Sequence, residues 1–324
     1  MINVNQLKTE INDYLLKKQY SASVQQLNNP INYTIAQKSK RIRPLLCLMV
    51  ASLNNNVYAN ALPAAASIEY FHNFTLLHDD IMDNADLRRN KPTAFKQFGL
   101  NSAILSGDFM LINAYQYLEE LPADVQLKCI RILNYAAAKV CEGQQLDINF
   151  ETTTAVSETD YLKMIAYKTA ALIAASLKMG AIVASLNEEQ ADHLYQFGWQ
   201  LGIAFQLLDD VLDVYGDVEK FGKKLAGDII QNKKTYLLIK ALELSTPADK
   251  AELLTWFNKT ETNEAEKIEA VTHLYNKINI EALTRQKAKD YTNNAFEHLN
   301  MIADSLAGIN QLSNFANQLL NRLT

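Results

Sequence analysis

Two clusters of aspartate close two apolar segments of the chain. EYFHNFTLLHDDIMD ends in Asp79, Asp80 and Asp83, and LGIAFQLLDDVLD ends in Asp209, Asp210 and Asp213. On a helix, the outer aspartates of each D-D-x-x-D triplet are i,i+4 neighbours, and their repulsion costs about 0.2–0.5 kcal/mol. One such triplet is usually a helix end that meets water, but two in matching apolar contexts indicate a function. Carboxylate oxygens suit hard cations such as Mg²⁺, which keep waters and bind substrate phosphates.

Basic residues lie close to both triplets in the sequence. Lys40, Arg41 and Arg43 precede the first triplet, and Arg88 and Arg89 follow it. The second triplet is followed by Lys223, Lys224, Lys233 and Lys234. Taken singly, each group reads as a solvated face. Lys168 differs, because a lysine inside the apolar run AYKTAAL is buried unless it faces a polar cavity. Arginine offers a planar fork and lysine a point charge to phosphate oxygens. With metal-binding aspartates, these cations predict two polyanionic ligands.

His72 lies seven residues before Asp79, so both fall on nearly the same helical face. This position allows His72 to donate to a phosphate, although a half-buried core histidine fits the same pattern. His78, beside Asp79, is expected to turn away. Motifs for other chemistries, such as G-x-S-x-G, H-E-x-x-H, G-x-x-x-x-G-K-[ST] and G-x-G-x-x-G, are absent from the sequence.

Composition favours long helices. The chain has 324 residues, 48% of them hydrophobic, with only 10 Gly and 6 Pro. Helical periodicity predicts an all-α fold, a single domain over 1–324 of about ten or more helices. The expected helices are 5–20, one starting near Pro44, 63–83, 101–119, 123–149, 158–185, 188–215, 232–244, 247–256, 263–276, 279–300 and 303–322. No run reads as an alternating strand with a hairpin turn.

Charge and cysteine usage narrow the function class. The net charge of −5 argues against a nucleic-acid binder. The three cysteines form no C-x-x-C pair, which indicates a reducing, cytoplasmic compartment. The charged N-terminus lacks the apolar core of a signal peptide. The stretch Ala170 to Leu186 carries Lys178 and predicts a buried helix, so no membrane span is expected.

These motifs, in this order, resemble those of trans-isoprenyl diphosphate synthases in the polyprenyl synthetase family. The resemblance covers about residues 38 to 240. It rests on K-x-x-R-P at 40–44, H-x-x-x-L-x-H-D-D-x-x-D-x-x-x-x-R-R at 72–89, G-Q-x-x-D at 143–147, K-T-A at 168–170, F-Q-x-x-D-D-x-x-D at 205–213 and G-K…G-D…K-x-T at 222–235. It implies an all-helical bundle around a central cavity, of the class I isoprenoid synthase type and usually a homodimer. It also implies an enzyme that joins an allylic diphosphate head-to-tail to isopentenyl diphosphate.

The resemblance also implies roles for individual residues. Asp79, Asp83 and Asp209 would bridge Mg²⁺, three ions with substrate bound, to the allylic diphosphate, and Asp80, Asp210 and Asp213 would complete the metal shell or hold its waters. The allylic diphosphate would also be held by Arg88, Lys168, Lys223 and Lys233, and isopentenyl diphosphate by Lys40, Arg43, His72 and Arg89. Lys168 and Lys233 would act in catalysis, with Thr169 and Gln206 presenting oxygens that stabilise an allylic cation.

Several positions depart from the family pattern. Lys38 and Ser39 replace the usual Gly-Gly before Lys40, and Asn90 stands where Gly commonly follows the paired arginines. Asn232 and Leu237 replace a common Gly and Pro near Lys233. Glycine at such sites permits unusual backbone geometry. These changes put local loop shape in doubt but remove no charged group.

Residues one turn before Asp79 are expected to line the path of the growing chain. These are Phe74 and Thr75. An aromatic residue five positions before the first aspartate resembles synthases of C20 products, so dimethylallyl, geranyl and farnesyl diphosphates are expected starters and geranylgeranyl diphosphate the product, with C15 next and longer chains third. Phe74 as simple core packing is the alternative, with Phe109 and Met110 as the floor.

Two other functions fit the sequence less well. A class I terpene cyclase typically carries one D-D-x-x-D and a different second metal motif, which disfavours it here. A non-catalytic scaffold homologue would be expected to lose aspartates, whereas all six are kept.

Overall fold

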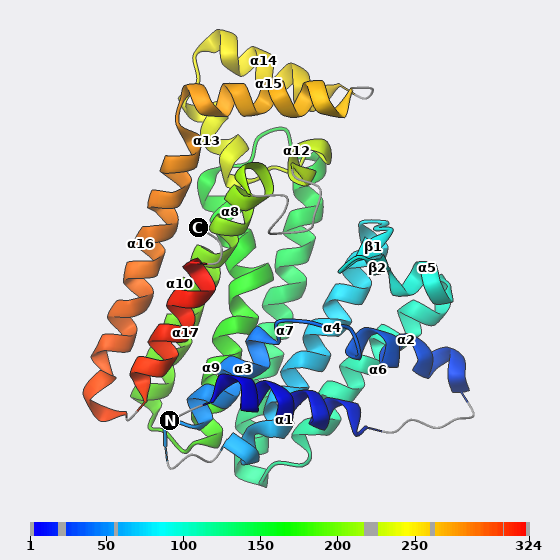
Figure 1. Ribbon diagram of the computed structural model, residues 1–324, viewed down its shortest axis with the longest axis vertical. Coiled ribbons are helices and arrows are strands. Elements are labelled where there is room, and N and C mark those ends of the chain that lie inside the picture. Colours follow the sequence, from blue (N-terminus) through cyan, green and yellow to red (C-terminus); the bar gives the residue numbers. More distant parts are fainter. Residues whose placement is uncertain are drawn as a thin grey trace. The chain divides into compact units, whose positions relative to one another are not determined.

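The computed structural model describes residues 3–18, 24–54, 58–216, 226–259, 263–306 and 308–321. Helices dominate this part of the chain (Figure 1), which confirms the predicted all-α class. The helices group into two compact units, the first made of Met1–Tyr135, Leu172–Tyr195 and Ile302–Leu312, the second of Ala136–Ala171, Gln196–Met301 and Ser313–Thr324. The boundary between the units falls inside two long helices, α7 and α10.

The first unit is built around α4. Its elements are α1 (Val4–Leu16), α2 (Gln25–Ile35), α3 (Ile42–Ala51), η2 (Tyr58–Ala61), α4 (Leu62–Met82), α5 (Ala94–Phe98), α6 (Leu100–Leu118) and η4 (Ala303–Ser305), with the first part of α7 (Ala123–Thr152), most of α9 (Ala171–Val183) and the first part of α10 (Glu188–Tyr215). Pro63 opens α4, where a missing N–H costs nothing. Residues 64–71 are buried all round that helix, as expected of a central core helix.

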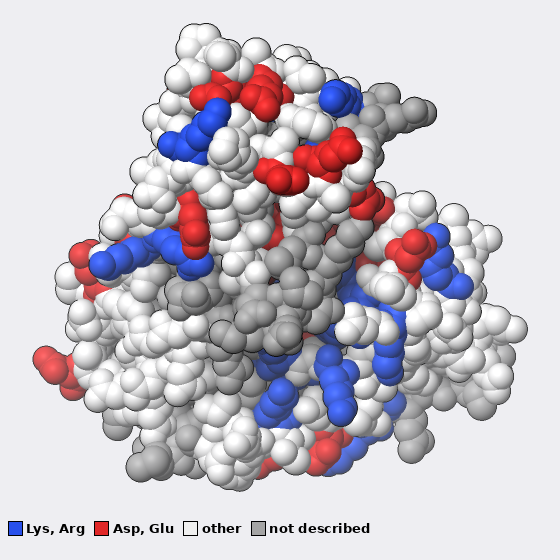
Figure 2. All heavy atoms as spheres, turned by 45° about the horizontal axis from the view of Figure 1, so that its top comes forward, with Lys and Arg blue, Asp and Glu red and all other residues white. Residues whose placement is uncertain are grey.

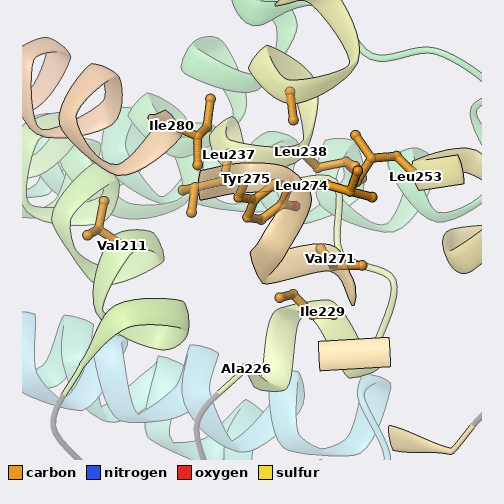
Figure 3. Close-up of a cluster of buried hydrophobic side chains, with 11 residues drawn as sticks. Val211, Ala226, Ile229, Leu237, Leu238, Leu253, Val271, Leu274, Tyr275 and Ile280 are labelled. Atoms are coloured by element: carbon orange, nitrogen blue, oxygen red, sulfur yellow. The ribbon is translucent and has the colours of Figure 1, made fainter. Parts of the chain in front are cut away.

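The second unit is organised around a compact apolar cluster. Its elements are the rest of α7 and α10, α8 (Glu158–Ile165), the π-helix η3 (Ala166–Ala170), α12 (Gly227–Ile230), α13 (Tyr236–Leu244), α14 (Pro247–Asn258), α15 (Glu264–Lys277), α16 (Ile280–Met301) and most of α17 (Ile309–Asn321). Figure 3 shows side chains from several of these helices meeting, among them Ile229, Leu237, Val271 and Leu274. Each fully buried Leu or Val contributes about 1.5–3 kcal/mol, so this cluster fixes α12 and α13 against α15.

Three sequence predictions about local structure need correction. A short antiparallel hairpin, β1 (Leu87–Arg88) with β2 (Lys91–Pro92), lies in the segment expected to be a loop. Its strands have two residues each, too few to show alternation. The predicted helix 158–185 is α8, a π-helical turn and α9 in succession. The predicted helix 232–244 starts only at Tyr236, because Asn232 has a left-handed backbone with φ of 58°.

Three α-helices, α2, α5 and the four-residue α12, carried no sequence prediction. α2 contains Pro30 within its span, a residue that usually breaks helices, and α5 has only five residues. One apolar stretch, Glu158–Val183, is long and apolar enough to cross a membrane. Because 72% of its apolar window is buried inside the protein, it is a core helix of the kind predicted for Ala170 to Leu186.

Candidate active site

The first aspartate triplet lies at the C-terminal end of α4. Asp80 is buried, Asp79 half-buried, and Asp83 is the exposed residue that follows the helix. Arg88 of β1 reaches back to the triplet: its Nε donates to Asp80 Oδ1 at 2.6 Å, and its Nη2 lies 3.6 Å from Asp79 Oδ2. Burial raises the pKa of Asp80, and Arg88 opposes this rise. Arg88 therefore neutralises carboxylates that burial and mutual repulsion disfavour as anions.

The hairpin that carries Arg88 depends on two residues with left-handed backbone. Arg89 and Asn90 have φ of 54° and 59° and form the two-residue loop between the paired Arg88 and Lys91. Such loops need positive φ at both positions, and asparagine adopts this conformation more readily than most residues. Asn90 thus provides the backbone shape for which the family commonly uses Gly, and the hairpin turns Arg88 towards α4.

His72 and Arg43 form a second pair in the same unit. Arg43 Nη1 lies 3.0 Å from His72 Nε2. Burial, followed by repulsion from Arg43, Arg89, Arg88 and Arg41, lowers the pKa of His72 well below its usual value. A neutral His72 accepts from Arg43 through Nε2, which places its proton on Nδ1. Lys40 is exposed at the start of the same segment. The four arginines around His72 make this region strongly cationic.

Arg41, which lies between Lys40 and Arg43 in the sequence, stabilises the fold through contacts with other segments. It is buried, and its Nη1 donates to Glu69 Oε1 at 2.5 Å, its Nε to Asn12 Oδ1 at 3.0 Å and its Nη2 to Ile35 O at 2.5 Å. Its φ of 50° starts α3 from a left-handed residue. The ion pair fixes the backbone on which Lys40 and Arg43 are carried.

The two residues predicted to govern chain length lie on α4. The Phe74 ring packs edge-on against Phe71, 5.6 Å between centroids, and against His78, 4.8 Å away. Thr75 Oγ1 donates to His72 O at 2.8 Å, so its hydroxyl is used within the helix. His78 Nε2 lies 3.1 Å from Ile104 O of α6, which agrees with the expectation that it turns away from Asp79. Phe74 is half-buried, and Met110 is fully buried.

In the second unit, Asp210 anchors a chain of hydrogen bonds. Tyr161 donates to Asp210 Oδ2, and Gln206 Nε2 donates to Asp210 Oδ1 at 3.1 Å. Thr169 Oγ1 donates to Gln206 Oε1 at 3.0 Å. Burial raises the pKa of Asp210 well above its usual value. The network orients the two oxygen-bearing residues predicted to act in catalysis, Thr169 and Gln206.

Lys168 and Lys233 share one carboxylate. Lys168 Nζ donates to Asp147 Oδ2 at 2.6 Å, and Lys233 Nζ lies 3.9 Å from the same oxygen. The π-helical turn that carries Lys168 packs directly on Gly143 of α7. A Cβ at Gly143 would lie 2.3 Å from the Lys168 backbone nitrogen, so no larger residue fits. π-helical turns occur frequently at functional sites, and this one holds Lys168 over Asp147.

The second triplet lies on the last turns of α10. Asp209 is exposed and Asp213 half-buried. Asp213 Oδ2 accepts from the backbone N of Asp228 at 2.9 Å and so joins α10 to α12. Burial, then repulsion by Asp213 and Asp209, raises the pKa of Asp228 to about 7. The predicted diphosphate ligand Lys223 lies outside the described residues.

Three residues of this region had no role in the sequence prediction: Asp147, Tyr161 and Asp228. Asp147 and Asp228 stand in motifs that carried the resemblance, G-Q-x-x-D and G-D, so the signal was present without a function attached to it. Tyr161 belongs to no motif. Its contact with Asp210 spans 49 positions in sequence and became visible only in the fold.

The carboxylates fit the chemistry of a magnesium site. Each unit places an aspartate triplet where burial and mutual repulsion raise the pKa of at least one member, Asp80 in the first and Asp210 in the second. Hard oxygen donors in this state favour a divalent cation. Within the described residues, no group of three or more His, Cys, Asp or Glu side chains is placed to hold a metal ion by itself. Mg²⁺ usually takes one or two carboxylates together with waters and substrate phosphates, so an open donor set suits it.

Basic side chains are gathered locally despite the negative net charge. Figure 2 shows a group of Lys and Arg side chains together in the lower half of the face that it views.

Comparison with known proteins places the chain in a family. A model of the polyprenyl synthetase family matches residues 24–275, a longer span than the motifs alone had indicated. The chain is 38% identical over 255 residues to a short chain isoprenyl diphosphate synthase of Methanocaldococcus jannaschii, covering 78% of each protein. It is 34% identical over 303 residues to a geranylgeranyl diphosphate synthase of Sulfolobus acidocaldarius, covering 92% of this chain and 91% of that protein.

A solved structure agrees with these relatives. The crystal structure of a geranylgeranyl pyrophosphate synthase superposes with a TM-score of 0.94 at 40% sequence identity and covers 99% of both chains. The chain therefore belongs to the polyprenyl synthetase family, and it is a prenyltransferase.

Proposed function

We propose that the protein condenses isopentenyl diphosphate with allylic diphosphates, in a Mg²⁺-dependent reaction, to the C20 product geranylgeranyl diphosphate. The observation that carries this proposal is the cationic region of the first unit, where burial and then repulsion from Arg43, Arg89, Arg88 and Arg41 lower the pKa of His72. A region this rich in guanidinium groups, next to an aspartate triplet, suits a diphosphate and its metal ions.

The first unit supplies the ligands of isopentenyl diphosphate in this proposal. Arg43 and Arg89 bind phosphate oxygens through their forks, and Lys40 adds an exposed point charge. Arg43 Nε is buried and makes no hydrogen bond within the described ranges, which is consistent with a guanidinium that completes its contacts on ligand binding. His72 holds Arg43 through Nε2, so its role is to orient that arginine rather than to donate through the same nitrogen.

The aspartate triplets and the remaining cations act on the allylic diphosphate. Asp79, Asp80 and Asp83, with Asp209, Asp210 and Asp213, hold the metal, three ions with substrate bound. When bound, Mg²⁺ neutralises the negative charge that develops on the departing diphosphate. Arg88, Lys168, Lys223 and Lys233 grip the same diphosphate. Asp147 holds Lys168 and Lys233 together and limits their mobility.

The reaction proceeds by separation of charge. The allylic C–O bond breaks, and the electron pair leaves with the diphosphate. The double bond of isopentenyl diphosphate attacks the allylic cation, a new C–C bond forms, and a proton is lost to the released diphosphate. Thr169 and Gln206, oriented by the bond between them, present oxygens to the cation. Apolar walls exclude water that would quench it.

Phe74 supports the C20 product. It is half-buried on α4, five residues before Asp79, and its ring is fixed on two sides by Phe71 and His78. A ring held in this way forms a firm floor for the prenyl chain. The similarity of the chain to geranylgeranyl diphosphate synthases supports this length.

We also propose that the protein is a cytoplasmic homodimer and that its two units form one domain. Apolar side chains of α6 are exposed to an unusual degree: Leu100 by 50%, Leu105 by 60% and Ile112 by 52%. Exposed apolar surface of this kind marks protein interfaces, which supports the homodimer. Light scattering after size exclusion tests the dimer, and Leu105→Glu is expected to give monomers.

The continuity of α7 and α10 across the unit boundary supports the single domain.

The activity is tested by turnover with farnesyl and isopentenyl diphosphates. We expect C–C bond formation that stops on addition of EDTA and returns with Mg²⁺. Asp79→Asn should lose at least about 100-fold in turnover, because the metal ions stabilise the charge that develops on the diphosphate. Asp192→Asn, at an exposed surface pair with Lys178, is the matched control. Turnover that is unaffected by EDTA or by Asp79→Asn contradicts the proposal.

A further inference from the structure

Lys267 of α15 is a buried lysine in a part of the chain to which the motifs gave no role. Its residue is only 2% exposed, whereas lysines are almost never fully buried unless they are paired. Its Nζ donates to Asn232 Oδ1 and lies 5.1 Å from the centroid of the Phe257 ring. Burial lowers the pKa of Lys267. An ammonium group placed at such a cost calls for a functional reason.

The position of Lys267 is set by the packing of α15. Val271, one turn further along on the same face, lies next to Ile229 of α12 in the apolar cluster of the second unit (Figure 3). Leu274 and Tyr275 belong to the same cluster. Because these side chains tie α15 to α12, the Lys267 ammonium is delivered to the turn that follows α12.

That turn determines where Lys233 points. Asn232 has a left-handed backbone, with φ of 58°, and the chain closes on α12 through a hydrogen bond of 2.9 Å from Lys233 N to Asp228 O. The next residue, Lys233, places its Nζ 3.9 Å from Asp147 Oδ2. A change of φ at Asn232 would redirect the Lys233 side chain.

The other end of the turn is held by Lys234. Its Nζ donates to the backbone carbonyls of Phe150, of Glu151 at 3.3 Å and of Thr153 at 2.6 Å, at the end of α7. Asn232 and Lys234 also line a cavity of about 650 Å³ bordered by residues 151–156, α13 and α14. Because one side of the turn faces this space, its conformation depends on the backbone hydrogen bond to Asp228 and on the contacts of Lys267 and Lys234.

We propose that Lys267 is a positioning residue for the allylic diphosphate: it fixes Asn232 in the left-handed conformation and thereby holds Lys233 towards Asp147 and the substrate. The inference rests on the proposed function, since that function assigns Lys233 to the diphosphate. It also gives a reason for the Asn at a position where the family commonly has Gly. Asparagine provides both the backbone conformation and an acceptor for Lys267.

The test uses Lys267→Met, which keeps the length and the apolar contact of the side chain but removes the ammonium. The substitution removes a hydrogen bond to a charged group, which contributes to stability. We expect part of this effect to appear as about a tenfold loss of affinity for the allylic diphosphate. The KM for farnesyl diphosphate should rise about tenfold, while that for isopentenyl diphosphate changes less than twofold. Calorimetric binding of inorganic diphosphate with Mg²⁺ should weaken by the same factor. Lys277→Met is the matched control, because Lys277 lies on the same helix as Lys267 but is exposed and pairs with Asp249 of α14. This variant should change none of these values.

A double-mutant cycle separates positioning from general stability. Glycine adopts the left-handed conformation without side-chain support, so in an Asn232→Gly background Lys267→Met should weaken diphosphate binding less than twofold. Asn232→Ala, at an exposed position, should reproduce the loss even if Lys267→Met fails to fold. Equal effects on both substrates, a lower melting temperature with unchanged diphosphate affinity, or a full loss in the glycine background overturns the inference. If the wild-type protein transfers no prenyl group, the proposed function fails, and the diphosphate affinities of these variants still decide the role of Lys267.

Discussion

Glu69→Gln should destabilise the protein strongly although it changes one atom of the side chain. Glu69 is 2% exposed and pairs with Arg41, whose side chain is 4% exposed. The amide cannot neutralise the guanidinium, which keeps its bonds to Asn12 and Ile35 but has lost its counter-charge. Asn73 Nδ2 also loses its carboxylate acceptor.

The expected magnitude follows from burial. Removing one partner of a buried ion pair costs about 3–5 kcal/mol, which lowers the ratio of folded to unfolded protein roughly 150- to 5,000-fold. The total free energy of unfolding of a native protein is only about 5–15 kcal/mol, so this loss is a large part of it. The loss should appear as a large drop in the urea midpoint at an unchanged slope, measured by circular dichroism.

The surface pair Lys178–Asp192 is the matched control. Its atoms lie 2.6 Å apart, but Asp192 is 56% exposed, so Asp192→Asn should cost about 0–1 kcal/mol. Replacing both partners, in Arg41→Met with Glu69→Leu, should recover much of the loss because no buried charge remains. If Glu69→Gln costs no more than Asp192→Asn, the buried pair does not support the start of α3.

Further predictions concern the site itself. Asp147→Asn removes the counter-charge that Lys168 and Lys233 share. The KM for farnesyl diphosphate should therefore rise about tenfold or more in steady-state kinetics. An unchanged KM would contradict the role of Asp147 in holding the two lysines. The folded-state pKa of His72 lies below the usual 6.5, so the unfolded protein binds more protons and the free energy of unfolding falls as the pH drops below about 6.5. In His72→Gln, the urea midpoint should therefore fall less between pH 7 and 5 than it does in wild type. Parallel curves of midpoint against pH for the two proteins would refute this. Phe74→Ala should lengthen the main product beyond C20 when dephosphorylated alcohols are separated by chromatography; an unchanged C20 product would move the floor to another residue.

The helical fold was predictable from sequence because periodicity and the scarcity of Gly and Pro act locally. The errors fall where a local signal was weak or misleading: Pro30 inside α2, a hairpin with two-residue strands, and the left-handed Asn232 that delays α13. Pro30 is buried in a helix that ordinary sequence signals exclude, and the hairpin and the turn at Asn232 are too short to leave a periodic pattern.

The site divides in the same way. Carboxylates at i and i+4 at the end of an apolar helix are visible in a sequence because they contradict ordinary helix chemistry. The contacts that orient them are not visible: Asp147 meets Lys168 across 21 positions, and Lys267 meets Asn232 across 35. Residues whose role is to hold another side chain were therefore missed, whereas the residues expected to touch substrate were named from their motifs and stay a prediction.

Product analysis tests the central claim most directly. Purified protein is incubated with Mg²⁺, isopentenyl diphosphate and, separately, dimethylallyl, geranyl and farnesyl diphosphates, and the dephosphorylated alcohols are resolved by chromatography. A C20 alcohol from all three starters is the predicted result. Products that stop at C15 or extend past C20 would contradict the chain length, and absence of condensation with every starter, from folded protein, would contradict the proposed reaction.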